Sequence, residues 1–225
     1  MFTGLIESTG TLLALTPSAP GHSAGPLRIT IAAPTLASRL NTGDSIAVSG
    51  VCLTALDIEP NAFPPRFSAD LAAETVARTT LTHLREGSIV NLELPTPAGS
   101  PLGGHVVQGH ADGTAILTAL EAITPGAPET DWRLRLRIPA NLTRYVVPQG
   151  SITVEGISLT VAALSGQDVE IAIIPHTYAA TSLHTLAAGS QVNIEVDVLG
   201  KYAERQLQTP ARHLLTEAYL LANGY

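Results

Sequence analysis

The sequence predicts an all-β protein made of two similar antiparallel barrels in tandem, with short helices and a helix at the C-terminus. Three observations support this prediction: an internal repeat, short alternating segments between Gly and Pro turns, and a loss of strand character after Gly200. Many short strands without regular strand–helix alternation favour small antiparallel barrels over a parallel sheet.

Four segments of the first half recur in the second half in the same order, at offsets of 102 to 106 residues. The pairs are 4–15 with 109–120, 43–56 with 149–162, 73–81 with 175–183, and 86–94 with 188–196. Collinear self-similarity of this kind indicates duplicated structural units. We therefore expect two homologous domains, residues 1–104 and 105–200, followed by a C-terminal helix over 201–225.

The expected strands alternate between apolar and polar residues. They include 27–34 and 132–139, which end at proline, then 45–56 and 151–164, and finally 90–94 and 192–196. Gly50 and Gly156 interrupt the middle pair and indicate a turn or a bulge. The period of two in the last pair predicts one buried face.

Short helices are expected where the strand pattern lapses. They fit residues 34–40 and 139–145, after prolines, and residues 72–84. The Pro- and Gly-rich stretches are expected to be solvated loops, and they are 17–25, 59–66 and 124–130.

The C-terminal segment has the pattern of an amphipathic helix. Thr209 before Pro210 suits an N-cap with proline at the first helical position, and Gly224 suits a stop. An apolar stripe recurs every seven residues at Leu207, Leu214 and Leu221, with Ala211 and Ala218 between them. Such a stripe either folds back onto a barrel or joins the same helix of another subunit, and three heptads do not decide between the two.

Composition restricts the class of protein. The chain has 225 residues, 45% hydrophobic and 14% charged, which is typical of a packed globular protein. A net charge of −7 without a basic stripe argues against nucleic acid and against an anionic membrane surface. One cysteine, Cys52, and no apolar segment resembling a signal peptide or a membrane span predict a cytoplasmic protein.

The segment PLGGHVVQGHAD, residues 101–112, places His105 and His110 five residues apart, with Asp112 close behind. On a strand, residues five apart face opposite sides, and no third ligand lies nearby, so we expect no metal site. Each histidine is then either a satisfied polar residue or an acid–base group.

The two halves also carry matched polar residues. Cys52 and Ser158 occupy one repeat position, with Thr54 and Thr160 two residues later on the same strand face. These residues either complete a core or line a site for a polar ring. Asp197 stands where the first half has a proline, which indicates either a diverged role or an exposed strand end.

Two further pairs open the expected helices: Glu74–Thr75 and His176–Thr177 either cap those helices or leave backbone N–H donors for a ligand. No dinucleotide-binding fingerprint, P-loop or Cys/His metal spacing is present.

Six motifs carry a resemblance to a known family: MFTGLIE, GVCLT, GGHVVQGHAD, GISLTV, IIPHT and VNIEVDVLGKYAER. Together they resemble riboflavin synthase of the alpha-chain type, from Met1 to about Arg205. The resemblance implies two six-stranded Greek-key barrels, a homotrimer held partly by C-terminal helices, and no metal or redox cofactor. It implies an active site between the N-terminal barrel of one subunit and the C-terminal barrel of a neighbour.

The resemblance also implies the reaction. Two molecules of 6,7-dimethyl-8-ribityllumazine would dismutate to riboflavin and 5-amino-6-(D-ribitylamino)uracil by transfer of a four-carbon unit. One lumazine loses a proton from its C7 methyl group, and the other is activated by a nucleophile at C7. Lumazine synthase is a further expected partner.

Site residues follow from the resemblance by motif. His110, Ser158 and Thr160 would transfer protons and donate hydrogen bonds at the reacting centre, Asp197 would orient them, and Cys52 would face them from the N-terminal site. The expected substrate-binding residues are Gly4, Leu5, Ile6, Ser45, Val51, Leu53, Thr54, Asp70, Leu71, Ala72, Ala73, Glu74, Thr75, Gly109, Ala111, Gln149, Ile157, Leu159, Ile171, Ile174, Pro175, His176 and Thr177. Gly4 to Ile6 and Asp70 to Thr75 are assigned to the N-terminal site.

Three positions depart from the family pattern. Glu155 replaces a usual Asp, Ser49 replaces a common Asn, and Gln149 stands where a lysine often reaches the ligand. The alternative function is a non-catalytic antenna-type protein that binds lumazine or flavin. The presence of all five reacting residues together with Thr54 favours the enzyme. A flavin reductase is disfavoured because no nucleotide-binding domain follows.

Overall fold

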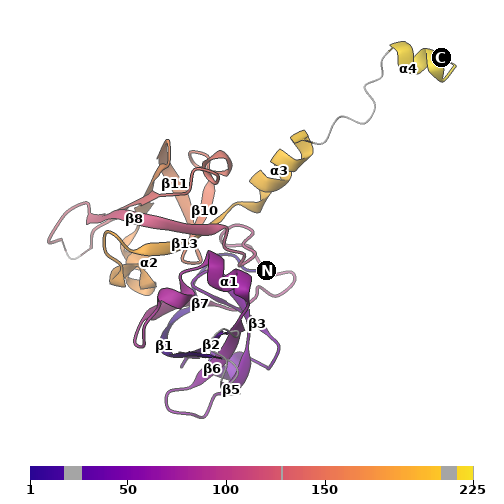
Figure 1. The fold of residues 1–225 in the computed structure, drawn as a ribbon. Helices are drawn as coiled ribbons and strands as arrows, with labels where there is room; N and C mark the ends of the chain where they lie inside the picture. The colour runs from indigo at the N-terminus through magenta and orange to yellow at the C-terminus, as the bar shows by residue number, and fades with distance from the viewer. Residues whose placement is uncertain (18–26, 128, 209–216, 225) are drawn as a thin grey trace.

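The computed structural model describes residues 1–17, 27–127, 129–208 and 217–224. The strands form two separate β units that meet at one face, with the N-terminus at their junction (Figure 1). All paired strands are antiparallel, as the Gly- and Pro-punctuated sequence predicts. The predicted all-β class with two tandem barrels is confirmed.

The N-terminal unit is a seven-stranded sheet in the order β4-β3-β7-β1-β2-β6-β5. Its strands are β1 (Ser8–Pro17), β2 (Leu27–Ala32), β3 (Ser45–Val48), β4 (Val51–Thr54), β5 (Leu56–Glu59), β6 (Arg66–Leu71) and β7 (Ile89–Glu93). β4 and β5 stand at the two ends of this order and are separated in the chain only by Ala55. They are therefore two halves of one interrupted strand. If β4 and β5 are counted as one strand, the unit has six strands.

The C-terminal unit is a closed six-stranded barrel in the order β10-β11-β12-β9-β8-β13. Its strands are β8 (Gly113–Ala122), β9 (Trp132–Arg137), β10 (Ser151–Val154), β11 (Ile157–Ser165), β12 (Asp168–Ile173) and β13 (Gln191–Val196). The uninterrupted β11 corresponds to β4 plus β5 in the repeat, so the strand orders of the two units are equivalent.

Each unit has its own aliphatic core. Ile29, Ile31 and Leu92 are fully buried in the first core, and Leu134 and Ile171 in the second. Strand alternation points these side chains inward, and burying each contributes roughly 1.5–3 kcal/mol. The two units are thus packed independently.

The expectation of a single buried face on 90–94 and 192–196 is wrong. Asn91, Glu93, Asn193 and Glu195 are buried as well, although their side chains leave the barrel cores. The amides of Asn91 and Asn193 contact the other barrel, and the carboxylates of Glu93 and Glu195 contact the segments that precede β1 and β8. Alternation in one strand cannot distinguish these environments.

Gly50 and Gly156 form hairpin turns and not bulges. Each turn has two consecutive residues with positive φ: Ser49 at 45° and Gly50 at 79°, then Glu155 at 49° and Gly156 at 81°. This geometry matches the right-handed twist of the flanking strands.

The predicted helices are shorter than expected. Residues 34–40 and 139–145 contain only single 3-10 turns, η1 (Ala37–Arg39) and η3 (Thr143–Tyr145). The segment 72–84 divides into α1 (Ala73–Arg78) and η2 (Leu81–His83), which α2 (Pro175–Ala180) and η4 (Ser182–Thr185) repeat. The segment 101–112 is not a strand, because only Val107 makes an isolated bridge.

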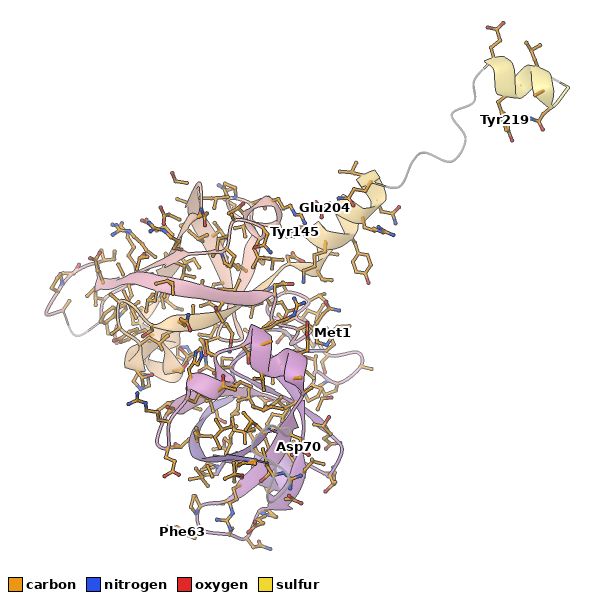
Figure 2. All side chains as sticks on the ribbon, in the orientation of Figure 1. Met1, Phe63, Asp70, Tyr145, Glu204 and Tyr219 are labelled. Carbon is orange, nitrogen blue, oxygen red and sulfur yellow. The ribbon has the colours of Figure 1, made fainter. Side chains whose placement is uncertain are left out.

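The C-terminal helix α3 (Val198–Gln208) begins before residue 201 and projects away from the barrels (Figure 1). Tyr145 and Glu204 face one another at its base (Figure 2), where the tyrosine hydroxyl donates to the carboxylate. Leu199, Tyr202 and Leu207 are exposed on it, Leu207 by 87%.

A further helix, α4, spans Glu217–Ala222, and the expected cap at Thr209 and Pro210 and the stripe residues Ala211 and Leu214 lie outside the described residues. None of the helices in the described parts of the chain is long and apolar enough to cross a membrane.

Candidate functional site

The segments that precede β1 and β8 cross at the junction of the two barrels. Phe2 N–H donates to the Val107 carbonyl at 2.8 Å, and Val107 N–H donates to the Phe2 carbonyl at 3.1 Å. Beyond this pairing, each segment reaches the hairpin of the other barrel. Ser158 N–H donates to the Gly4 carbonyl at 2.8 Å, and Cys52 N–H donates to the Gly109 carbonyl at 2.8 Å.

Side-chain packing also joins each of these segments to the opposite barrel. Ile6 packs against the core of the C-terminal barrel, whereas Ala111 packs against the core of the N-terminal barrel. Gly4 and Gly109 both have positive φ, at 75° and 77°, and a Cβ atom on either would lie within 2.7 Å of Ser158 or Cys52. Only glycine allows the backbone to come this close to the hairpins.

Two asparagines lock the barrels together reciprocally. The Asn91 amide donates to the Glu155 carbonyl at 2.8 Å, and the Asn193 amide donates to the Ser49 carbonyl at 3.0 Å. Glu155 is buried beside them, which raises its pKa to about 7 against hydrogen bonds from Asn193 N–H and the Ser49 hydroxyl. This buried polar surface explains why the two barrels share a defined orientation.

Cys52 lies in a cavity of about 390 Å³ that we call the Cys52 pocket. Its walls come from β4, α1, the segment that precedes β8, and α3. The lining residues are Val51, Cys52, Glu74, Thr75, Arg78, Thr79, Gln108, Gly109, His110, Ala111, Asp112 and Lys201. Lys201, the only lysine of the sequence, lies 2.6 Å from Asp112. The pocket therefore combines a thiol, an imidazole and a cation from three parts of the chain.

Ser158 occupies the equivalent place in the other barrel, and we call its surroundings the Ser158 site. His105 Nδ1 lies 2.7 Å from Ser158 Oγ, and His105 Nε2 lies 3.2 Å from Thr153 Oγ1. Burial lowers the pKa of His105, and the negative charge of Asp197 opposes this shift. A neutral imidazole bonded to a hydroxyl can accept a proton or relay one.

Asp197 stands at the edge of the Ser158 site. It lines a separate cavity of about 400 Å³ between the barrel and α3, together with Tyr145, Ser151 and Glu204. Its carboxylate accepts a hydrogen bond from Leu199 N–H at 2.9 Å, which holds it at the start of α3. The carboxylate found in only one repeat thus faces a cavity and not open solvent.

The structure divides the expected reacting residues between the two places. His110 lies with Cys52, whereas Ser158 lies with His105, so His110 and Ser158 are not neighbours within one chain. Gly4 and Ile6, which we assigned to the N-terminal site, lie instead against the Ser158 hairpin and the C-terminal core.

Several expected binding residues turn their side chains into the cores. These are Leu53, Leu71, Leu159 and Ile171, each 8% exposed or less, and only their backbone could touch a ligand. Thr54 and Thr160 are exposed on the opposite strand face from these leucines, as the alternation predicts.

The remaining expected residues lie outside these two places. Ser45 and Leu5 line a cavity of about 580 Å³, and Asp70 pairs with Arg28 at 2.7 Å. The first turns of α1 and α2 and the residues before them hold six more, which are Ala72, Ala73, Ile174, Pro175, His176 and Thr177. Ile157 is buried, and Gln149 is exposed in a turn. Ala72 and Ile174 are the N-caps of these helices and make no side-chain cap bond.

Sequence reasoning did not assign His105 a role beside Ser158, nor did it find two buried carboxylates. Glu93 accepts hydrogen bonds from Thr3 and Gly4, and Glu195 accepts them from Gln108, Gly109 and His110. Their recurrence in VNLEL and VNIEV was the available signal. Within the described residues, no three His, Cys, Asp or Glu side chains cluster as a metal site would require.

Comparison with known proteins agrees with the duplicated architecture. The lumazine binding domain family matches residues 3–95 and again 108–197, which defines the class as a tandem lumazine-binding protein. Riboflavin synthase of Mycobacterium tuberculosis (strain ATCC 25618 / H37Rv) is 44% identical over 93% of this chain and 99% of its own. Riboflavin synthase of Bacillus amyloliquefaciens is 42% identical over the full length of both chains. The chain belongs to the riboflavin synthase family.

Solved structures support the fold. The crystal structure of LumP complexed with riboflavin has a TM-score of 0.75, covering 87% of this chain and 99% of that one, at 23% identity. The structure of LumP complexed with 6,7-dimethyl-8-(1'-D-ribityl) lumazine has a TM-score of 0.73 at 22% identity.

Proposed function

We propose that the chain is a riboflavin synthase that dismutates two molecules of 6,7-dimethyl-8-ribityllumazine to riboflavin and 5-amino-6-(D-ribitylamino)uracil. The observation that carries this proposal is the pairing of equivalent but chemically unequal places in the two barrels. One holds Cys52 and His110, and the other holds the hydrogen-bonded His105–Ser158 pair. A reaction between two identical molecules with different fates needs such a duplicated and diverged site.

The polar side chains of the Ser158 site and of the Cys52 pocket transfer the protons of the reaction. In the Ser158 site, neutral His105 polarises the Ser158 hydroxyl, and Thr160 extends the same polar strand face. Asp197 orients this group electrostatically. On the other ring, Cys52 and His110 line the pocket and deliver the hydrogen bonds. Holding both rings in register supplies roughly 7–11 kcal/mol of the barrier reduction.

The finer assembly is part of the proposal. We propose a homotrimer in which the Cys52 pocket of one subunit faces the Ser158 site of a neighbour, with residues 1–104, 105–200 and 201–225 as its working units. The exposed Leu199, Tyr202 and Leu207 of α3 support this arrangement, because an apolar stripe on a projecting helix suits burial between subunits. We further propose a cytoplasmic protein that needs no cofactor or metal and receives its substrate from lumazine synthase.

One incubation tests the activity. The purified protein is mixed with 6,7-dimethyl-8-ribityllumazine alone, and riboflavin is followed by its fluorescence and by chromatography. Riboflavin and 5-amino-6-(D-ribitylamino)uracil in equal amounts are the expected products. Binding of the lumazine without any flavin would instead support an antenna-type binding protein, the alternative that the tandem fold also allows.

A further inference from the structure

Two glutamates of the inter-barrel face hold the crossing segments by their backbone. Glu195 accepts from three successive N–H groups, of Gln108 at 2.7 Å, Gly109 at 2.9 Å and His110 at 3.0 Å. Only 3% of this residue is exposed. Three donors on one buried carboxylate fix both the position and the direction of a segment that has no ladder of its own.

Glu93 makes the equivalent contacts in the other half. It accepts from Thr3 N–H at 2.7 Å, from the Thr3 hydroxyl at 2.9 Å and from Gly4 N–H at 3.0 Å. It is 4% exposed. Burial raises the pKa of both carboxyl groups, while the N–H donors oppose that shift.

The segments held in this way belong to the pockets of the opposite barrels. Glu195 stands on β13 of the C-terminal barrel, yet the segment that it holds covers Cys52 in the N-terminal barrel. Glu93 stands on β7 of the N-terminal barrel, yet its segment covers Ser158 in the C-terminal barrel. Each glutamate is therefore separated from the pocket it shapes by one segment of backbone.

We propose that Glu195 is the positioning residue of the Cys52 pocket and that Glu93 is the positioning residue of the Ser158 site. Each barrel thus sets the geometry of the other barrel's substrate site through a buried carboxylate that is bonded to backbone N–H groups. This inference rests on the proposed function for its catalytic consequence, but not for its structural test.

Glutamine is the informative substitution at both positions. It keeps the size of glutamate, but its amide can present only one acceptor oxygen, and its NH₂ group would face backbone N–H donors. In Glu195→Gln the segment 108–110 should move away from Cys52, and in Glu93→Gln the segment 3–4 should move away from Ser158. The two variants are matched controls, because the lost contacts are equivalent and only the affected pocket differs.

Cys52 reports on its own pocket, because it is the only cysteine of the sequence. Alkylation by iodoacetamide, followed by mass spectrometry, measures its accessibility in the unliganded full-length protein. We expect at least about a tenfold faster reaction in Glu195→Gln, equivalent to about 1.4 kcal/mol, and an unchanged rate in Glu93→Gln. With 6,7-dimethyl-8-ribityllumazine added, protection of Cys52 should need about tenfold more ligand in Glu195→Gln only.

Equal alkylation rates in the two variants, or no change in Glu195→Gln, would overturn the inference. Far-UV circular dichroism checks that each variant is folded, and Glu195→Asp, which keeps the carboxylate, should restore part of the slow alkylation. If Glu195→Gln does not fold, Glu195→Asp against Glu93→Asp carries the same comparison. Failure of the wild type to form riboflavin would refute the proposed function and leave this alkylation result intact.

Discussion

The contact between the Gly50 and Gly156 hairpins makes a sharp prediction about Gly50. A Cβ atom at this position would lie 2.6 Å from Gly156 N and 2.9 Å from Gly156 Cα. Both are backbone atoms in a tight turn, so they cannot rotate away as a side chain would. Gly50→Ala must therefore push the two hairpins apart and stretch the reciprocal asparagine bonds beside them.

The cost has two parts. Alanine at a φ of 79° costs roughly 1–2 kcal/mol wherever it stands. Overpacking against backbone adds typically about 1–3 kcal/mol, so the total loss of unfolding free energy should be roughly 2–5 kcal/mol. Gly87→Ala is the matched control, because Gly87 has a φ of 87° and no atom within 4 Å of an added Cβ.

Urea unfolding followed by far-UV circular dichroism gives the two free energies of unfolding. Gly87→Ala should lose only the conformational part, and Gly156→Ala should behave as Gly50→Ala does. A loss in Gly50→Ala no larger than that in Gly87→Ala would refute the idea that this contact holds the barrels at a fixed distance.

Two other predictions concern titration and proton transfer. Because the pKa of Glu155 is raised to about 7 in the folded state, the unfolded state loses its proton first as pH rises. The free energy of unfolding of the wild type should thus fall by roughly 3 kcal/mol between about pH 4.5 and pH 7, relative to that of Glu155→Gln. Plots of unfolding free energy against pH that run parallel for the two proteins would contradict this. His105→Ala and Ser158→Ala should each lower riboflavin formation about a hundredfold. The double variant should lose no more than either single one, whereas multiplicative losses would mean that the pair does not act as a unit.

Much of the fold could be predicted because each barrel strand is a local pattern. Strands such as β2 and β9 alternate with a period of two, and a barrel core needs little more than that periodicity to orient its side chains. Helix lengths were less predictable, since the segments after Ala33 and Ile138 form single 3-10 turns. Their packing against a barrel end, and not their own propensity, decides where they stop.

Local sequence patterns predicted only part of the candidate site. The equivalence of Cys52 and Ser158 follows from the repeat, but the sequence left open whether they complete a core or line a site. The partners of these residues did not follow, because the segments 1–7 and 101–112 are neither strands nor helices and carry no periodicity. His105 and His110 consequently reach different barrels, although they lie five residues apart.

The sequence alone determined that the barrel is present in two copies, that its strands alternate in polarity, and that Cys52 and Ser158 occupy one repeat position. Those features depend on local alternation and on self-similarity, and both can be read along a single chain. Only the tertiary structure decided that Glu93 and Glu195 are buried and that the crossing segments complete the opposite barrels. A polar residue on a strand has the same signature whether it faces water or a second barrel, so that choice belongs to the contact between the two units.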